Sequence, residues 1–223
     1  MDPHQIADLL GEMPVFAPLS ADERLVLARR MRPRRFAKGE VVFHRDDPAG
    51  HLYLIAAGTV KVATVDERGH EIVLAVERGG DVFGELALFD GEARSATVTA
   101  MNETEALTLQ SDDFFAVLEH NPRAMRQLLA LLARMVRRAS GRVEDLVFLD
   151  VPSRVAKRLT DLAEIGGSAG LDLTQEDLAS FVGATRVSVN RVLADLDQRG
   201  LVKIGRRHIE IPDVEALRRE IRY

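Results

Sequence analysis

The stretch TQEDLASFVGATRVSVNRVLADLDQ, residues 174–198, predicts two short helices joined by a tight turn. Ala179 is small where a second helix must cross closely, and Gly183 suits the turn that follows. Val189 and Val192 then supply apolar anchors on the inner face of the second helix. These are the packing requirements of a helix-turn-helix. The alternative, an unrelated helical hairpin, does not need all of them together.

The second predicted helix carries the side chains that could read DNA. Thr185 can cap its first turn, and the residues after the cap would face base edges in the major groove. Arg186 and Arg191 could each donate two hydrogen bonds to a guanine, whereas a threonine or serine hydroxyl suits a phosphate oxygen. For Arg191 the alternative is an ion pair with Asp195. The predicted DNA-contacting residues of this helix and its cap are Thr185, Arg186, Val187, Ser188, Asn190 and Arg191.

Two alternating runs follow in LVKIGRRHIEI, residues 201–211, and they predict a β-hairpin. Arg206 and Arg207 lie at its tip, and Arg206 suits a contact with DNA phosphate. A helix-turn-helix followed by a hairpin predicts a winged helix-turn-helix.

The first 120 residues have a different pattern. Residues 1–35 show helical spacing, with Ser20 and Glu23 as a capping box and Pro33 ending the second helix. Eight of the sixteen glycines then separate short β-type runs. Short strands with frequent turns predict a β-roll or barrel. The runs are residues 40–44, 52–57, 59–65 (where Val60 and Val62 alternate with Lys61), 71–77, 95–100 and 106–110.

Two helices are predicted after the β-runs. Ser111 is expected to cap the first, and Pro122 opens a longer one. Apolar residues of the longer helix recur at steps of four and three, which favours a dimer helix over one packed on its own domain. Residues 148–151, before and around the next helix start at Pro152, form a predicted hinge. The apolar seam consists of Met125, Leu129, Leu132, Val136, Ala139, Val143 and Leu146.

One stretch of the β-region, GGDVFGELALFDGEARSATVTA at residues 79–100, could bind an anion. Gly84 lets backbone N–H groups approach a negative charge, and Glu85 could accept a hydrogen bond from a ribose hydroxyl. Arg94 with the next serine offers a guanidinium and a hydroxyl to a phosphate. The alternatives are a turn glycine and a surface ion pair. The candidate residues are Gly84, Glu85, Leu86, Arg94 and Ser95.

The composition excludes several classes of protein. The chain has 223 residues, a net charge of −5 and no cysteine, which excludes disulfides, cysteine nucleophiles and cysteine-held clusters. The six histidines lack metal-ligand spacing, and no Walker loop or Ser-His-Asp arrangement is present. We therefore predict no metal site, no catalytic residue and no enzyme. No apolar run approaches the roughly 18 residues of a membrane span, and the acidic start is unlike a signal peptide, so we expect a cytoplasmic protein that binds no membrane.

Taken with FLDVPSRVAKRL at residues 148–159, these motifs in this order resemble the CRP/FNR family of transcription regulators over essentially the full length. The resemblance implies an α+β protein that forms a homodimer and binds double-stranded DNA. It also implies RNA polymerase as a partner and a cyclic nucleotide, expected to be cyclic AMP, as allosteric effector. The implied domains are a cyclic-nucleotide-binding β-roll at 1–121, a dimerisation helix at 122–147, a hinge at 148–151 and a winged helix-turn-helix at 152–223.

The resemblance also implies which residues meet the effector. In that family the counterparts of Gly84, Glu85, Arg94 and Ser95 hold the ribose and the cyclic phosphate. A Thr-Ser pair on the dimer helix meets the base, and here that pair reads Ala139-Ser140, so only the serine hydroxyl is kept. The alternatives are a regulator of the same fold that senses another anion, such as cyclic di-GMP, and one that is active without a ligand.

Overall fold

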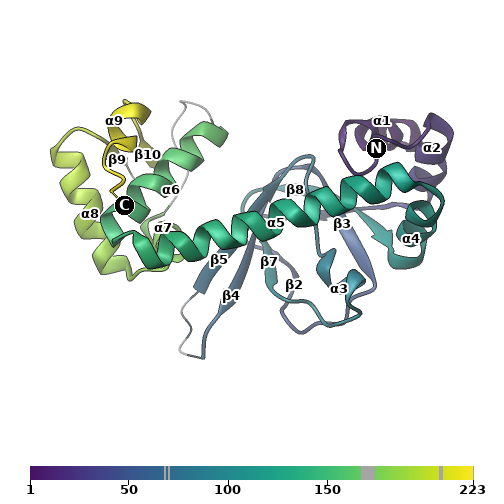
Figure 1. Cartoon of the computed structure of the whole chain (residues 1–223), viewed down its shortest axis with the longest axis horizontal. Helices are drawn as coiled ribbons and strands as arrows, with labels where there is room; N and C mark the ends of the chain where they lie inside the picture. The colour runs from purple at the N-terminus through teal and green to yellow at the C-terminus, as the bar shows by residue number, and fades with distance from the viewer. Residues whose placement is uncertain (68, 70, 167–173, 206–207, 223) are drawn as a thin grey trace. The chain divides into compact units, whose positions relative to one another are not determined.

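The computed structural model describes residues 1–67, 69, 71–166, 174–205 and 208–222. The chain divides into two compact units, one built from residues 1–64 and 74–136 and the other from residues 65–73 and 137–223. Figure 1 labels most of the elements of both units. Among the described residues, no helix is both long enough and apolar enough to span a bilayer.

The N-terminal unit begins with two short helices, α1 (Pro3–Glu12) and α2 (Ala21–Arg30), which pack against each other. The predicted capping box at α2 is confirmed: Glu23 N donates to Ser20 Oγ at 3.2 Å, and Ser20 N donates to Glu23 Oε2 at 2.7 Å. A second capping box, formed by Asp2 and Gln5, starts α1. The helical start of the chain is therefore confirmed as far as the end of α2.

The helical prediction was wrong for residues 32–35, which belong to strand β1 (Arg32–Phe36). Pro33 does end the helical region, but the chain then pairs antiparallel with β8 (Thr104–Gln110), with Pro33 opposite Leu107. Proline is tolerated there because β1 lies at the edge of its sheet. Four of its five residues are exposed, so the strand shows no apolar alternation that the sequence could reveal.

The β-region forms two four-stranded sheets among the described residues, in the orders β1-β8-β3-β6 and β2-β7-β4-β5. All six predicted runs form strands, whereas the two-residue β6 was not predicted. The predicted alternation in β4 holds only in part: Val60 is buried, but Val62 is half-buried and Ala63 is buried. The remaining strands are β2 (Val41–Phe43), β3 (His51–Ala57), β4 (Thr59–Val65), β5 (Glu71–Arg78), β6 (Val82–Phe83) and β7 (Thr97–Ala100).

Two further helices belong to this unit, α3 (Leu86–Phe89) and α4 (Ser111–His120). The expectation that Ser111 caps α4 was wrong, because the N-cap position is held by Gln110, whose side chain makes no capping bond. Gln110, the last residue of β8, already has the extended backbone of an N-cap, so Ser111 lies in the first turn of α4.

Helix α5 (Pro122–Phe148) has two apolar faces. Ala124 and Leu128 are buried, and they pack with α1, α2 and α4 into one core cluster. The predicted seam is a different face, and most of it is exposed in the single chain. The exposed fractions are 58% for Leu129, 66% for Val136, 60% for Val143 and 55% for Leu146. The N-terminal half of α5 therefore packs on its own domain, while much of an apolar stripe along the helix stays exposed in the described chain.

The C-terminal unit contains α6 (Val151–Gly166), α7 (Gln175–Val182), α8 (Arg186–Gln198), β9 (Lys203–Gly205), β10 (His208–Glu210) and α9 (Val214–Arg218). The predicted helix-turn-helix and hairpin are confirmed as α7, α8 and the pair β9–β10 (Figure 1). Helix α9 was not predicted. It adds the fully buried Leu217 to the same core as Leu178 and Leu193.

Only Leu149 and Asp150 separate α5 from α6, at the place of the predicted hinge. Leu149 is buried, and Asp150 Oδ1 accepts a hydrogen bond of 2.9 Å from Ser153 N in the first turn of α6. Arg154 donates to Leu149 O through Nη1 and to Val182 O through Nε, each at 3.0 Å. One arginine thus links the end of α5 to the end of α7.

We expect Asp150→Ala to destabilise the C-terminal unit by about 1 kcal/mol through loss of the cap. The Ser153 N–H holds the pKa of Asp150 below its ordinary value. The folded state therefore favours the carboxylate, so this stabilisation is complete above the unfolded pKa of about 3.9 and is lost as the pH falls below it. Urea unfolding at pH 7 and pH 3 measures the difference in the free energy of unfolding between wild type and variant. This difference, the gap, should be smaller at pH 3. An equal gap at both values would contradict the charged cap.

Candidate ligand and DNA sites

The first candidate site lies where β6 turns into α3. Gly84 has φ +78°, a backbone conformation that favours glycine. A Cβ added there would lie 2.7 Å from Arg94 Nη1, so a side chain would collide with the arginine. Glycine is therefore required at this position both by the turn and by the close approach of Arg94.

Arg94 is buried, with 3% of its surface exposed. Its Nη1 donates to Gly84 O at 2.6 Å, and its Nη2 donates to His51 O at 2.7 Å. Its Nε is shielded from solvent and has no hydrogen-bond partner among the described residues. Burial lowers the pKa of Arg94, with the nearby Tyr53 and Glu85 opposing that shift. A buried cation with an unpartnered donor is an environment that suits an anion.

Glu85 adds an acceptor beside this cation. Its side chain is 5% exposed, and burial raises its pKa while its own backbone N–H and Arg94 act in the opposite direction. The structure thus brings together Gly84, Glu85 and Arg94 as the sequence predicts. Leu86 is 40% exposed at the start of α3, and Ser95 is exposed beside Arg94 in the chain.

Ser140 is exposed on α5 and belongs to the other unit, so its role stays a prediction. The sequence did not reveal that Arg94 lies against aromatic rings. Phe43 from β2 is 4.3 Å from the guanidinium carbon, and Tyr53 from β3 stacks on Phe83 at 4.8 Å. These rings come from three strands, and no local pattern links them.

The second candidate site is the helix-turn-helix. Gly183 has φ +62° and ends α7, as the turn requires. Thr174 caps α7, where Asp177 N donates to its Oγ1 at 3.0 Å. Thr185 caps α8, where Ser188 N donates to its Oγ1 at 3.2 Å. The predicted cap at Thr185 is confirmed, and it fixes where α8 begins.

The start of α8 presents a mostly exposed surface. Val187 is 71% exposed, and Arg186 and Arg191 are also exposed. Arg186 Nη1 lies 3.7 Å from Glu176 Oε2, a surface ion pair that contributes little. The alternative pairing of Arg191 with Asp195 is absent within 4.0 Å in the described chain, because Asp195 pairs with Arg199 at 3.1 Å.

Two predicted DNA-contacting positions differ from the others. Asn190 was expected to point outward, but it is half-buried and its Oδ1 is shielded from solvent with no partner among the described residues. Asn190 directly follows the fully buried Val189, so it lies next to the face of α8 that packs in the core. Arg206, at the predicted wing tip, lies outside the described residues.

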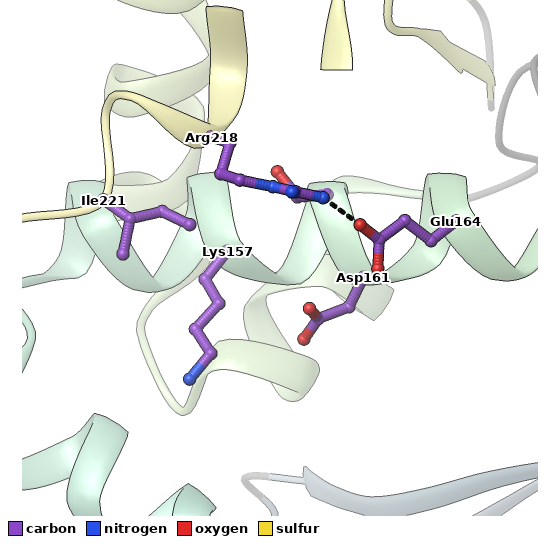
Figure 2. A pocket seen from close by; sticks show the side chains of 6 residues that line it. Lys157, Asp161, Glu164, Arg218 and Ile221 are labelled. Carbon is purple, nitrogen blue, oxygen red and sulfur yellow. Dashed lines mark hydrogen bonds and ion pairs between the residues drawn. The ribbon is translucent and has the colours of Figure 1, made fainter. Parts of the chain in front are cut away.

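A recess of about 470 Å³ lies between α6 and the C-terminal residues Arg218 and Ile221 (Figure 2). Figure 2 shows Lys157, Asp161 and Glu164 on α6, with Arg218 paired to Glu164. Lys157 also pairs with Asp145. Because its lining combines both signs of charge and these ion pairs are satisfied, we do not assign an anion site to it.

Comparisons with known proteins match two separate parts of the chain to two families. Residues 33–121 match the family described as "Cyclic nucleotide-binding domain", and residues 153–220 match the "Crp-like helix-turn-helix domain". The chain is 35% identical over 222 residues to a CRP-like cAMP-activated global transcriptional regulator of Mycobacterium tuberculosis, covering 96% of this chain and 99% of the relative.

Two proteins from Thermus thermophilus are also similar. A cyclic AMP receptor protein is 32% identical over 204 residues, covering 92% of this chain and 94% of the relative. The solved structure of a CRP-family transcriptional regulator aligns with a TM-score of 0.74 and 31% identity, covering 84% of this chain and 96% of that one. The likeness therefore extends over both units.

Proposed function

This chain belongs to the CRP/FNR family of transcription regulators, and from that membership we propose that it is a homodimer whose DNA binding is controlled by cyclic AMP. The observation that carries the proposal is the buried Arg94 beside Gly84, with Nε unpartnered among the described residues. It lies in the segment that matches a cyclic-nucleotide-binding domain. Two similar proteins are themselves named as a cAMP-activated regulator and a cyclic AMP receptor protein.

In this proposal each ligand residue has one task. Arg94 and Ser95 bind the cyclic phosphate, because a guanidinium and a hydroxyl donate to phosphate oxygens. Glu85 accepts a hydrogen bond from the ribose, while Gly84 and Leu86 bring backbone N–H groups near the ligand. The sixth residue, Ser140, meets the base. These contacts position the effector and involve no chemical step, so the protein is proposed not to be an enzyme.

The dimer forms along the exposed seam of α5. Its apolar side chains at steps of four and three suit a parallel two-stranded coiled coil. Effector binding favours one arrangement at the hinge, which places the two α8 helices about 34 Å apart on successive major grooves. Thr185, Arg186, Val187, Ser188 and Arg191 contact DNA, and Arg206 contacts phosphate. RNA polymerase is a further proposed partner, and the cytoplasm is the proposed location.

A second candidate effector is another anion, such as cyclic di-GMP. Ala139 favours this alternative because its side chain cannot hydrogen-bond to a base where the family has threonine. Calorimetric titration of the purified protein with cyclic AMP, cyclic GMP and cyclic di-GMP tests the proposal, with operator binding measured in parallel. Heat released only by cyclic di-GMP would select the alternative. Operator binding that no nucleotide changes would show a regulator active without ligand.

The exposed Val187 gives a prediction about DNA sequence. Valine offers an apolar surface that suits a thymine methyl, whereas a glutamate accepts a hydrogen bond from a cytosine amino group. Val187→Glu should therefore shift the preference at that position toward a G·C pair by roughly 1–3 kcal/mol. Selection from a random DNA pool with both proteins measures this. Identical half-sites from wild type and variant would mean that Val187 does not face a base.

A further inference from the structure

The guanidinium carbon of Arg94 lies over an aromatic ring. The centroid of Phe43 lies 4.3 Å from Arg94 Cζ, and that of Tyr53 lies 5.8 Å away. Both fall within the roughly 6 Å over which a ring face attracts a cation. We propose that Phe43 is a positioning residue of the anion site, because its ring fixes the plane of the Arg94 guanidinium and thereby the direction of Nε. This inference rests on the proposed role of Arg94 as a phosphate ligand.

Hydrogen bonds alone do not fix that plane. Nη1 is held by Gly84 O at 2.6 Å and Nη2 by His51 O at 2.7 Å, which restrains two of the three nitrogens. The guanidinium can still tilt about the line that joins those two atoms. Nε lies off this line, so a tilt would swing its N–H away from a bound phosphate. The Phe43 ring, packed 4.3 Å from the guanidinium carbon, opposes this tilt.

Two neighbouring rings hold the Phe43 side chain against Arg94. Its ring lies 5.6 Å from that of Tyr53 and 6.0 Å from that of Phe83. A Cβ added at Gly84 would lie 3.4 Å from Phe43 Cε1 and 2.7 Å from Arg94 Nη1. The absence of a side chain at Gly84 therefore leaves room for both Phe43 and Arg94. The site residues and the ring are thus packed as one group.

The test compares ring and non-ring side chains at this position. Phe43→Leu removes the ring face but stays apolar, and it should weaken cyclic AMP affinity about tenfold in calorimetry on the full-length dimer. Phe43→Tyr keeps the aromatic ring, so this variant should bind cyclic AMP within about twofold of wild type. The matched control is Phe36→Leu, since Phe36 is a buried ring that packs on Tyr53 at 6.4 Å. It should lower thermal stability without a comparable loss of affinity.

A spectroscopic readout separates positioning from general destabilisation. The Arg94 Nε–H resonance should carry a ring-current shift that Phe43→Leu loses and Phe43→Tyr keeps. Equal affinity of the Leu and Tyr variants, or an equal loss in Phe36→Leu, would overturn the inference. If Arg94→Met abolishes binding while Phe43→Leu binds as wild type does, the proposed function stands and the inference fails. If wild type binds no cyclic nucleotide, the proposed effector fails, and an unchanged Nε–H resonance in Phe43→Leu would still overturn the positioning role.

Discussion

Cyclic nucleotide affinity is expected to fall by about 10- to 100-fold when Arg94 is replaced by methionine. Methionine is apolar and long enough to occupy much of the same buried space, but it cannot donate to phosphate. A hydrogen bond to a charged group contributes about 1.5–3 kcal/mol, and tenfold in affinity corresponds to about 1.4 kcal/mol. Calorimetry with cyclic AMP measures the loss, and circular dichroism confirms that the variant is folded.

Arg29→Met is the matched control for this experiment. Arg29 is an exposed arginine on α2 in the same unit, so the substitution removes the same charge from the same domain. It should leave the affinity within about twofold of wild type, because solvent and salt screen the interaction of an exposed charge with a distant ligand. If Arg94→Met binds as tightly as this control, Arg94 has no role in binding the phosphate.

Val136→Glu should convert the dimer into a monomer and weaken operator binding by about two orders of magnitude. Val136 is 66% exposed in the single chain, so the substitution should leave the fold of each unit intact. In a parallel two-stranded seam it places two carboxylates together among apolar side chains. A monomer engages one half-site, and the avidity of two linked readers, often 10²–10⁴, is lost. Sedimentation velocity and a DNA-binding titration measure both effects.

Helix α5 also provides a control for this experiment. Gln127→Glu adds the same charge at another exposed position of α5 that is not part of the seam. This variant should remain a dimer with wild-type affinity for DNA. A wild-type protein that is monomeric at micromolar concentration would exclude the seam as a dimer interface, and with it the model of two half-sites.

Features that depend on neighbouring residues were predictable from the sequence. The caps at Ser20, Thr174 and Thr185 and the turn at Gly183 each arise within one turn of a helix, and all four occur in the structure. The residue types of Gly84, Glu85 and Arg94 indicated an anion site, and the resemblance to a known family strengthened that expectation. Their short separation in sequence does not by itself bury the arginine or leave its Nε unpartnered.

Features that depend on long-range pairing were not predictable. Strand β1 has no apolar alternation, and it becomes a strand only because β8, far along the chain, pairs with it. The contact of Phe43 with Arg94 joins a strand to a loop that is distant in sequence. The half-buried Asn190 shows the same limit on a smaller scale, since helical periodicity could not show how far the core extends around α8.

The two outer strands of the sheet β1-β8-β3-β6 are poor templates for aggregation. An exposed edge strand offers unpaired N–H and C=O groups to a neighbouring molecule, and long, flat, apolar edges are the dangerous ones. Strand β1 carries Arg32, Arg34 and Arg35 with Pro33, which has no N–H, and β6 at the other edge has two residues. These arginines are the reason that β1 lacks the apolar alternation of a predictable strand. Because they repel a second copy that approaches edge to edge, they should also keep concentrated protein in solution.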